Sequence, residues 1–522
     1  MAKVFVDVLG ETTVTRCGAT FLRKIDVEHP AAKVIIEASN AVDNAVGDGT
    51  TSAVVLTGSL VKGADELLVS GTAPILISEG YAQALGISLD FLERLSRKTS
   101  SSNRQILTAV ARTCLNSKLI LLSGVPEVAA NIVVDAIVTI SDFQNNSVET
   151  DNIKIEEKIG NPIDTSLVRG VVIDKTIDSS GMPRTIRNAK ILLIDVELDN
   201  RLMRGEAEVR VDSHRDFRAF LTGMSDSLKL MINGIIESGA DIVISRKGIG
   251  LLAQSILAQS NIISVKRVKE NDLRWIEKAT GAKITNDLGI SSIRSYLGYA
   301  GHVHESLVGE DRMVFIEECI NPKAVTILLR SNCKTTLDEF HRSMVHTIQV
   351  LQNYIVKPLI VYGGGSLEAI IANKIKKIAN ATSGRQQLVL EKFALALEEI
   401  PLTIARNAGM DEMNTITELR SKISRQHDTK LGWYGINAMD RKVDDMRSKM
   451  VIESAVVKEQ VLKTAVEVTS LLIKVDDVLI KKQLMNTHIH SDGTTHSHSG
   501  GNKKHDHFDR LGKQQRPMHH YY

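Results

Sequence analysis

The first 140 residues combine a short β-branched segment with long helical patterns. Residues 4–8 (VFVDV) and 12–15 (TTVT) flank Leu9-Gly10-Glu11, which predicts a β-hairpin. Apolar residues recur at helical spacing over residues 30–46, where Pro30 suits a first helical turn. A second helix is expected from Thr50 to Gly71, and more amphipathic helices between residues 73 and 140. This segment is therefore predicted to be almost entirely helical.

The pattern changes near Lys154. The sequences IKIEEKIG, GVVIDKTI and AKILLIDVEL predict strands, and a helical stretch over residues 214–239 follows them. Strand and helix patterns then alternate over residues 240–281, which implies parallel βαβ units. Two further strands, DRMVFIEEC and AVTILLR, precede a return to helices at about residue 335. The chain is thus predicted to insert an α/β module into a helical module whose two halves form one core.

Length and composition restrict the class of protein. A chain of 522 residues suggests two to four domains, and 43% hydrophobic with 24% charged residues is usual for a globular protein. A net charge of +2 gives no general electrostatic argument for nucleic acid or membrane partners. No apolar run is long enough to span a bilayer or to form a signal peptide. The four cysteines lack CxxC spacing, which fits a reducing cytoplasm better than a disulfide or zinc framework.

The C-terminal segment, residues 486–522, differs from the rest of the chain. It is poor in aliphatic residues and rich in Gly, Ser, Lys and His, which predicts a disordered tail. Its histidine pairs could chelate Ni²⁺, Cu²⁺ or Zn²⁺, but spacing alone fixes no coordination geometry, so a plain polar tail is the preferred interpretation. These pairs are His488/His490, His496/His498, His505/His507 and His519/His520.

The pentapeptide Gly47-Asp48-Gly49-Thr50-Thr51 is the strongest candidate for chemistry. Glycines on both sides of Asp48 let the backbone approach a ligand, and the following helix presents free N–H groups that suit a phosphate. A carboxylate beside phosphates makes sense if it holds Mg²⁺. The alternative is a plain turn between two helices with a threonine N-cap, and the pentapeptide alone does not exclude it.

At this point the sequence resembles group II chaperonins, the archaeal thermosome and its relatives in the TCP-1 family. The resemblance rests on residues 24–56, on LVRGVVIDKTIDSSGMPRTIRNAKILLID, and on the later segments KATGAKI, VGEDRMVFIEECINPKAVTILLR, VYGGGSLEAIIA and WYGINAMDRKVDDM. It covers residues 1 to about 482. The implied fold is a multidomain α + α/β chaperonin fold with a helical equatorial domain in two halves, a small intermediate hinge domain and an inserted α/β apical domain with a helical protrusion.

The resemblance implies the following domain boundaries. The equatorial domain would comprise residues 1–104 and 363–485, the intermediate domain residues 105–168 and 325–362, and the apical domain residues 169–324, with the tail at 486–522. In similar chaperonins a strand like residues 473–480 pairs with a neighbouring subunit, although pairing within one chain is the alternative. Apolar residues of the protrusion could meet unfolded chains or form core: Phe217, Phe220, Leu221, Met224, Leu228, Leu230 and Met231.

The resemblance also implies a nucleotide site with ATP and Mg²⁺ as ligands. Asp48 would hold the magnesium, while the catalytic position of the family, normally aspartate, falls on His346, for which an ordinary helix residue is the alternative. A strand-to-helix turn is the alternative for the glycines after residue 362. The residues implied in nucleotide binding are Gly18, Ala19, Thr20, Gly47, Asp48, Gly49, Thr50, Thr51, Gly364, Gly365, Asn437, Asp445 and Glu453.

Three departures from the family pattern bear on function. The family begins upstream with a glycine-containing phosphate loop, so either Met1 is misplaced as a start or half of the phosphate cradle is absent. Where the family has the pattern Asn-Asp-Gly-Ala-Thr, this sequence has Arg-Cys-Gly-Ala-Thr, so Cys17 occupies the position of the family's aspartate. His346 stands at the hydrolytic aspartate, and Ser331-Asn332 replaces a glycine pair before its helix.

Two functions follow from these observations. The chain resembles an ATP-binding subunit of a double-ring chaperonin that folds unfolded proteins with paralogous subunits, in which ATP hydrolysis closes the lid. The alternative is a hydrolysis-deficient structural or regulatory subunit that retunes a ring built with active paralogues. A βαβ enzyme for small molecules finds little support, because the central module shows no paired acid and base or nucleophile set.

Overall fold

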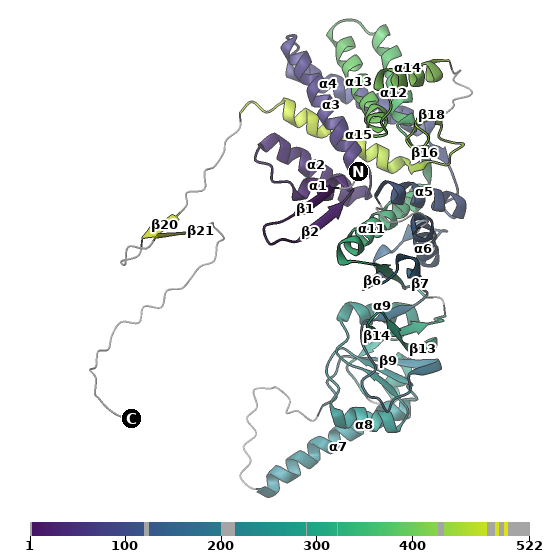
Figure 1. Cartoon of the computed structure of the whole chain (residues 1–522). Coiled ribbons are helices and arrows are strands. Elements are labelled where there is room, and N and C mark those ends of the chain that lie inside the picture. The colour runs from purple at the N-terminus through teal and green to yellow at the C-terminus, as the bar shows by residue number, and fades with distance from the viewer. Residues whose placement is uncertain are drawn as a thin grey trace. The chain divides into compact units, whose positions relative to one another are not determined.

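A computed structural model of the chain describes residues 3–118, 125–199, 214–288, 290–320, 322–425 and 433–477, with two short strands further on (Figure 1). For residues 214–225, 290–292 and these two strands it describes the backbone alone. The chain forms two units, Met1–Lys474 and Val475–Tyr522, and each is described by itself.

The N-terminal elements follow the predicted pattern. Strands β1 (Lys3–Val6) and β2 (Thr12–Thr15) pair antiparallel with Val4 opposite Val14, which confirms the hairpin. The short helix α1 (Gly18–Lys24) leads to α2 (Pro30–Val46) and α3 (Thr50–Val69). Pro30 occupies the first turn of α2, where its missing N–H is not needed.

The two ends of the chain share one helical core. Helix α12 packs on α4, α13 packs on α3 and α4, and α15 packs on α2, α3 and α4 (Figure 1). Tyr81 of α4 and Phe393 of α13 meet edge to face with ring centroids 5.8 Å apart, and both are fully buried. The prediction of one core from two helical halves is confirmed. The helices not yet bounded are α4 (Pro74–Leu95), α12 (Ser366–Ala381), α13 (Arg385–Asn407), α14 (Glu412–Ser424) and α15 (Ala455–Ile473).

Several short strands at the edge of this bundle were not predicted. Strand β16 (Leu359–Tyr362) pairs antiparallel with β19 (Ile452–Ser454) and with β3 (Arg97–Lys98). Strands β17 (Tyr434–Asn437) and β18 (Lys442–Asp445) form a hairpin. Apart from the β17–β18 hairpin, these pairings join segments far apart in the chain, which local patterns do not reveal.

A three-stranded sheet carries the chain into the α/β insertion and back. Strand β15 (Val325–Ser331) pairs parallel with β6 (Ile153–Ile159) and antiparallel with β7 (Ser166–Val168). Helix α11 packs on β15, α5 and α6, whose buried side chains belong to the large helical core. The remaining bounds in this region are α5 (Arg104–Lys118), α6 (Val125–Ile140), β4 (Ser141–Asp142), β5 (Ser147–Val148), η1 (Thr150–Asn152), η2 (Pro162–Asp164) and α11 (Lys334–Val356).

The insertion has its own sheet and its own core. The strand order is β11-β10-β9-β13-β14-β8, and β12 also pairs with β9. Strands β9, β10 and β11 are parallel, as predicted, and β12, which was not predicted, also runs parallel to β9. Strands β13, β14 and β8 are antiparallel, and β13 was missed. The bounds are β8 (Val171–Ile173), β9 (Thr185–Ile194), α7 (His214–Ser238), β10 (Ile242–Ser245), α8 (Leu251–Gln259), β11 (Ile263–Val265), α9 (Glu270–Thr280), β12 (Ile284–Thr285), α10 (Ile290–Tyr296), β13 (Gly298–Val308) and β14 (Asp311–Glu317).

The apolar residues predicted on the protrusion have different surroundings. Leu228 is buried in the core of the insertion, Met231 packs partly against that core, and Leu230 is exposed. The side chains of Phe217, Phe220, Leu221 and Met224 lie outside the described residues.

The second unit contains two short strands, β20 (Asn486–Ile489) and β21 (Thr495–His498), which pair antiparallel with each other. The rest of the predicted disordered tail and the side chains of its histidine pairs lie outside the described residues. Of the strand predicted at 473–480, Ile473 ends α15, residues 475–477 have no regular structure and residues 478–480 are not described. Among the helices that the structure describes, none has both the length and the apolar character to cross a bilayer.

Candidate functional site

The pentapeptide predicted to bind phosphate forms a tight connection between α2 and α3. Gly47 ends α2 with φ 71°, and Gly49 precedes α3 with φ 80°, so both adopt the left-handed conformation that favours glycine. A Cβ on Gly49 would also lie 2.6 Å from a methyl group of Val461 in α15. The glycines therefore place Asp48 at the N-terminus of α3, where free N–H groups suit an anion.

A cavity of about 210 Å³ lies at this helix N-terminus. It is formed by the segment before α1, the start of α3, the end of α5 and the N-terminal half of α15. Gly18 lines one side, where a Cβ would lie 2.5 Å from the hydroxyl of Thr51. The lining residues are Arg16, Cys17, Gly18, Asp48, Gly49, Thr50, Thr51, Ser52, Thr113, Ser117, Lys118, Glu453, Val457, Lys458 and Val461.

Lys118 is the buried cation of the site, and the sequence analysis missed it. Its Nζ donates a hydrogen bond to the carbonyl of Gly47 and lies 3.3 Å from Oδ1 of Asp48. Burial lowers the pKa of Lys118, but the nearby acidic groups, Asp48 first among them, together outweigh burial and raise the pKa well above its usual range. The only sequence signal that Lys118 is buried was its position, because it continues the apolar stripe of Leu107, Ala111 and Leu115 along α5.

Asp48 is ionised in this setting. Burial alone would raise the pKa of its carboxyl, but the Lys118 charge and the Gly49 N–H outweigh burial and hold the pKa below the usual value. Its side chain keeps 30% exposure, in contrast to 6% for Lys118. An ionised, partly accessible carboxylate beside a helix N-terminus is a suitable oxygen ligand for Mg²⁺.

A second buried lysine lies across the cavity on α15. Nζ of Lys458 lies 2.9 Å from Oε1 of Glu368 and also contacts Oε2 of Glu453. Burial lowers the pKa of Lys458, but the two carboxylates outweigh burial and raise it. Burial raises the pKa of Glu453, which Lys458 counteracts only in part. The lining of the cavity therefore contains two buried lysines, each paired with carboxylates.

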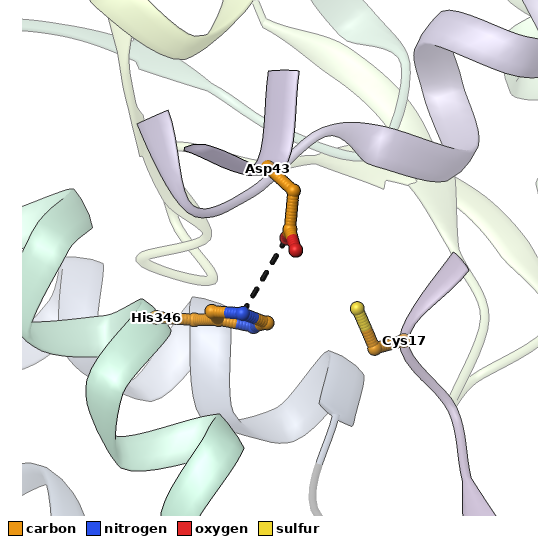
Figure 2. Close-up of side chains that lie close together, drawn as sticks. All are labelled: Cys17, Asp43 and His346. Atoms are coloured by element: carbon orange, nitrogen blue, oxygen red, sulfur yellow. Dashed lines mark ion pairs between the residues drawn. The ribbon is translucent and has the colours of Figure 1, made fainter. Parts of the chain in front are cut away.

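Cys17, Asp43 and His346 form a cluster immediately behind this cavity (Figure 2). Nε2 of His346 lies 3.4 Å from Oδ1 of Asp43, and Nδ1 lies 3.4 Å from Nζ of Lys118. Burial and the Lys118 charge lower the pKa of His346 to about 4, so the ring is neutral at pH 7.

The structure gathers some of the predicted nucleotide residues and separates others. Gly18, Asp48, Gly49, Thr50, Thr51 and Glu453 line the cavity, and Gly47 adjoins it through Lys118. Ala19 and Thr20 are buried in α1 and do not line it.

Four of the predicted residues near the C-terminal half make other contacts. Gly364 accepts a hydrogen bond from the N–H of Ile436 in β17, and Gly365 packs against Pro401 of α13. Asn437 donates to Asp440, and Asp445 pairs with Arg447. None of these four lines the cavity of about 210 Å³, so their part in nucleotide binding stays a prediction.

The fold and the cavity together define the class of this protein: a multidomain α + α/β chain with an anion-suited site in its helical part. Comparison with known proteins identifies the family. A profile of the TCP-1/cpn60 chaperonin family matches residues 1–483. Thermosome subunit alpha of Sulfurisphaera tokodaii is 40% identical over 492 residues, which cover 91% of this chain and 86% of that protein.

Two further matches agree with this assignment. Thermosome subunit alpha of Thermoplasma acidophilum is 39% identical over 486 residues, covering 92% of this chain and 88% of the relative. The structure is similar to the open-state monomer of a group II chaperonin from Methanococcoides burtonii, with a TM-score of 0.58 and 32% identity over 82% of this chain and 100% of that one. The chain belongs to the TCP-1/cpn60 chaperonin family and is a group II chaperonin subunit.

Proposed function

We propose that this chain is an ATP-binding subunit of a cytoplasmic double-ring chaperonin, assembled with paralogous subunits and acting on unfolded proteins. The observation that carries the proposal is the ionised Asp48–Lys118 pair at the N-terminus of α3, beside a cavity of about 210 Å³. Chaperonins of this family are ATPases, and their assembled particle would use ATP hydrolysis to close the lid. The four cysteines are all free, which agrees with a reducing compartment.

The residues present fit a magnesium-bound triphosphate. Asp48 offers a partly exposed carboxylate for Mg²⁺, and the lysines Lys118 and Lys458 line the same cavity. A Cβ at Gly18 would lie 2.5 Å from the hydroxyl of Thr51, and one at Gly49 would lie 2.6 Å from Val461, so the packing around the cavity requires glycine at both places. Bound Mg²⁺ would neutralise part of the phosphate charge.

A second candidate function is that of a hydrolysis-deficient subunit that retunes a ring containing active paralogues. Attack of water on a phosphate needs a group that orients the water and accepts its proton. Nδ1 of His346 faces the ammonium group of Lys118, and Nε2 faces Asp43. Since both ring nitrogens are directed at protein groups, His346 is poorly arranged to serve as that base.

Binding of ATP tests the proposed function. Isothermal titration of the full-length protein with ATP in Mg²⁺ is expected to show binding, and Asp48→Asn is expected to weaken it at least about tenfold because a charged ligand to the metal is lost. Asp226→Asn is the matched control, because Asp226 is exposed on α7 and pairs only with Lys229 among the described contacts. Equal affinity of wild type and Asp48→Asn, or no binding by the wild type, would contradict the proposal.

A further inference from the structure

The cluster of Cys17, Asp43 and His346 brings three metal-ligating side chains together from distant parts of the sequence. Cys17 precedes α1, Asp43 lies in the last turn of α2, and His346 lies in the middle of α11. Their ligand atoms all lie within 4.8 Å of one another, and the residues are 3%, 5% and 9% exposed. Figure 2 shows the three side chains directed toward a common point.

Asp43 provides an independent sign that a ligand belongs there. Its Oδ2 accepts a hydrogen bond of 2.9 Å from Arg23, whereas its Oδ1 is buried without a hydrogen-bond donor among the described residues. A buried carboxylate oxygen without a donor is unfavourable, and native proteins rarely leave one in that state. This oxygen is the one that faces His346.

We propose that Cys17, Asp43 and His346 bind a Zn²⁺ ion, with water as the fourth ligand. Thiolate sulfur, imidazole nitrogen and carboxylate oxygen are the protein ligands of zinc, and tetrahedral bonds of about 2.0–2.3 Å place ligand atoms about 3.3–3.7 Å apart. The distance of 3.4 Å between Nε2 of His346 and Oδ1 of Asp43 already lies in this range. The Sγ atom of Cys17 needs to move toward these two atoms by about 1 Å or less.

The protonation states that binding requires are available in the surroundings. The thiol of Cys17 gives its proton to solvent on binding, so the thiolate and Asp43 together neutralise the divalent charge. Coordination through Nε2 of His346 places the ring proton on Nδ1. Lys118 then keeps its contacts with Gly47 and Asp48 and gives up the one with His346. Arg23 stays on the other oxygen of Asp43.

This site differs from the magnesium position at Asp48 in chemistry and does not depend on nucleotide. Asp48 offers only oxygen, which suits a hard cation, whereas the cluster contains sulfur and nitrogen, which select zinc or a similar transition metal. A bound ion would join α11 to α2 and to the segment before α1. The sequence could not reveal it, because no two of the three ligands have the spacing of a zinc motif.

Cobalt substitution tests the site in the full-length protein. Titration of the reduced, metal-free chain with Co²⁺ to saturation is expected to produce a thiolate-to-cobalt charge-transfer band that Zn²⁺ removes. Histidines of the C-terminal tail do not contribute to this band, because residues 486–522 contain no cysteine. The matched pair is Cys17→Ser, which should lose the band, and Cys333→Ser, which should keep it because Cys333 is exposed and away from the cluster.

Two further measurements complete the test. His346→Ala and Asp43→Asn are each expected to weaken Co²⁺ binding at the thiolate site at least tenfold. X-ray absorption of the wild-type protein loaded with cobalt should show one sulfur neighbour, which requires no variant to fold. The absence of a thiolate band in the wild type, or its persistence in Cys17→Ser, would overturn the proposal.

Discussion

Replacing Cys17 and His346 together with aspartate is expected to raise the ATP turnover of the isolated subunit about 100-fold, because a positioned general base typically contributes that much or more. Cys17 lines the cavity that contains Asp48 and Lys118, and His346 lies behind it with Nδ1 3.4 Å from Nζ of Lys118. Cys17→Asp places a carboxylate at the cavity wall. His346→Asp replaces an imidazole whose two nitrogens both face protein groups with a carboxylate that keeps an oxygen to accept a proton from water. Phosphate release from the purified subunit measures the effect.

The control for this experiment combines the double variant with Asp48→Asn. If the gain arises in this cavity, the triple variant should return to the low turnover of the wild type. A double variant that folds, binds ATP and shows no gain would mean that another part of the phosphate cradle limits hydrolysis. A wild-type subunit that already releases phosphate rapidly would contradict the idea that His346 is a poor base.

Lys458→Met is expected to lower the free energy of unfolding by about 3–5 kcal/mol, because removal of one partner leaves buried charges without compensation. Lys458 is 7% exposed and is the cation between Glu368 and Glu453, and Oε2 of Glu368 already lacks a hydrogen-bond donor among the described residues. Thermal or urea unfolding of the full chain measures the loss.

Lys463→Met is the matched control on the same helix. Its side chain is 47% exposed and pairs with Glu459 one turn away, so the expected change in the free energy of unfolding is about 0.5 kcal/mol or less.

The pH dependence of the stability loss in Lys458→Met gives a second check. Burial raises the pKa of Glu453, so its charge destabilises the fold at high pH and this destabilisation is removed as pH falls through the raised pKa. The deficit of Lys458→Met should therefore be smaller at pH 5 than at pH 7.5, and an equal deficit would contradict this explanation.

Much of the fold could be predicted because its local signals agree with one another. Pro30, the left-handed Gly47 and the left-handed Gly49 mark the boundaries of α2 and α3, and the structure places both helix starts where the pattern does. The change from helical to alternating patterns near Lys154 coincides with β6, and the insertion that follows has its own core. These features depend on residues close together in the sequence.

Other features depend on tertiary contacts and were not predictable in this way. Strand β13 forms a hairpin with β14 and pairs with β9 from a distant part of the chain, and its sequence GYAGHVHESLV mixes polar and apolar residues because much of it is only partly buried. The antiparallel part of the sheet was therefore missed. Short strands such as β16 and β19 depend on each other for pairing, so neither is visible alone.

The candidate site also has one part that local sequence predicts and another part that only the fold assembles. Asp48 and its glycines form a local motif, and the family resemblance gave it a function. Lys118, Lys458 and Asp43 have no motif of their own, since a lysine or aspartate on a helix usually faces solvent. Only the fold brings Lys118 to Asp48 and brings Asp43 to Cys17 and His346. The resemblance predicts that Cys17 and His346 stand where the family has aspartates, but it did not predict that the two residues lie together.

We propose that this subunit binds ATP with Mg²⁺ at Asp48, and the second candidate function adds that the isolated subunit does not cleave the bound ATP. The most direct measurement saturates the purified subunit alone with ATP labelled on its terminal phosphate in Mg²⁺, separates the protein by rapid filtration, and identifies the nucleotide that remains bound. The account predicts about one bound nucleotide per chain, recovered as ATP with its label intact. A chain recovered without nucleotide, or with ADP and released phosphate, would contradict it.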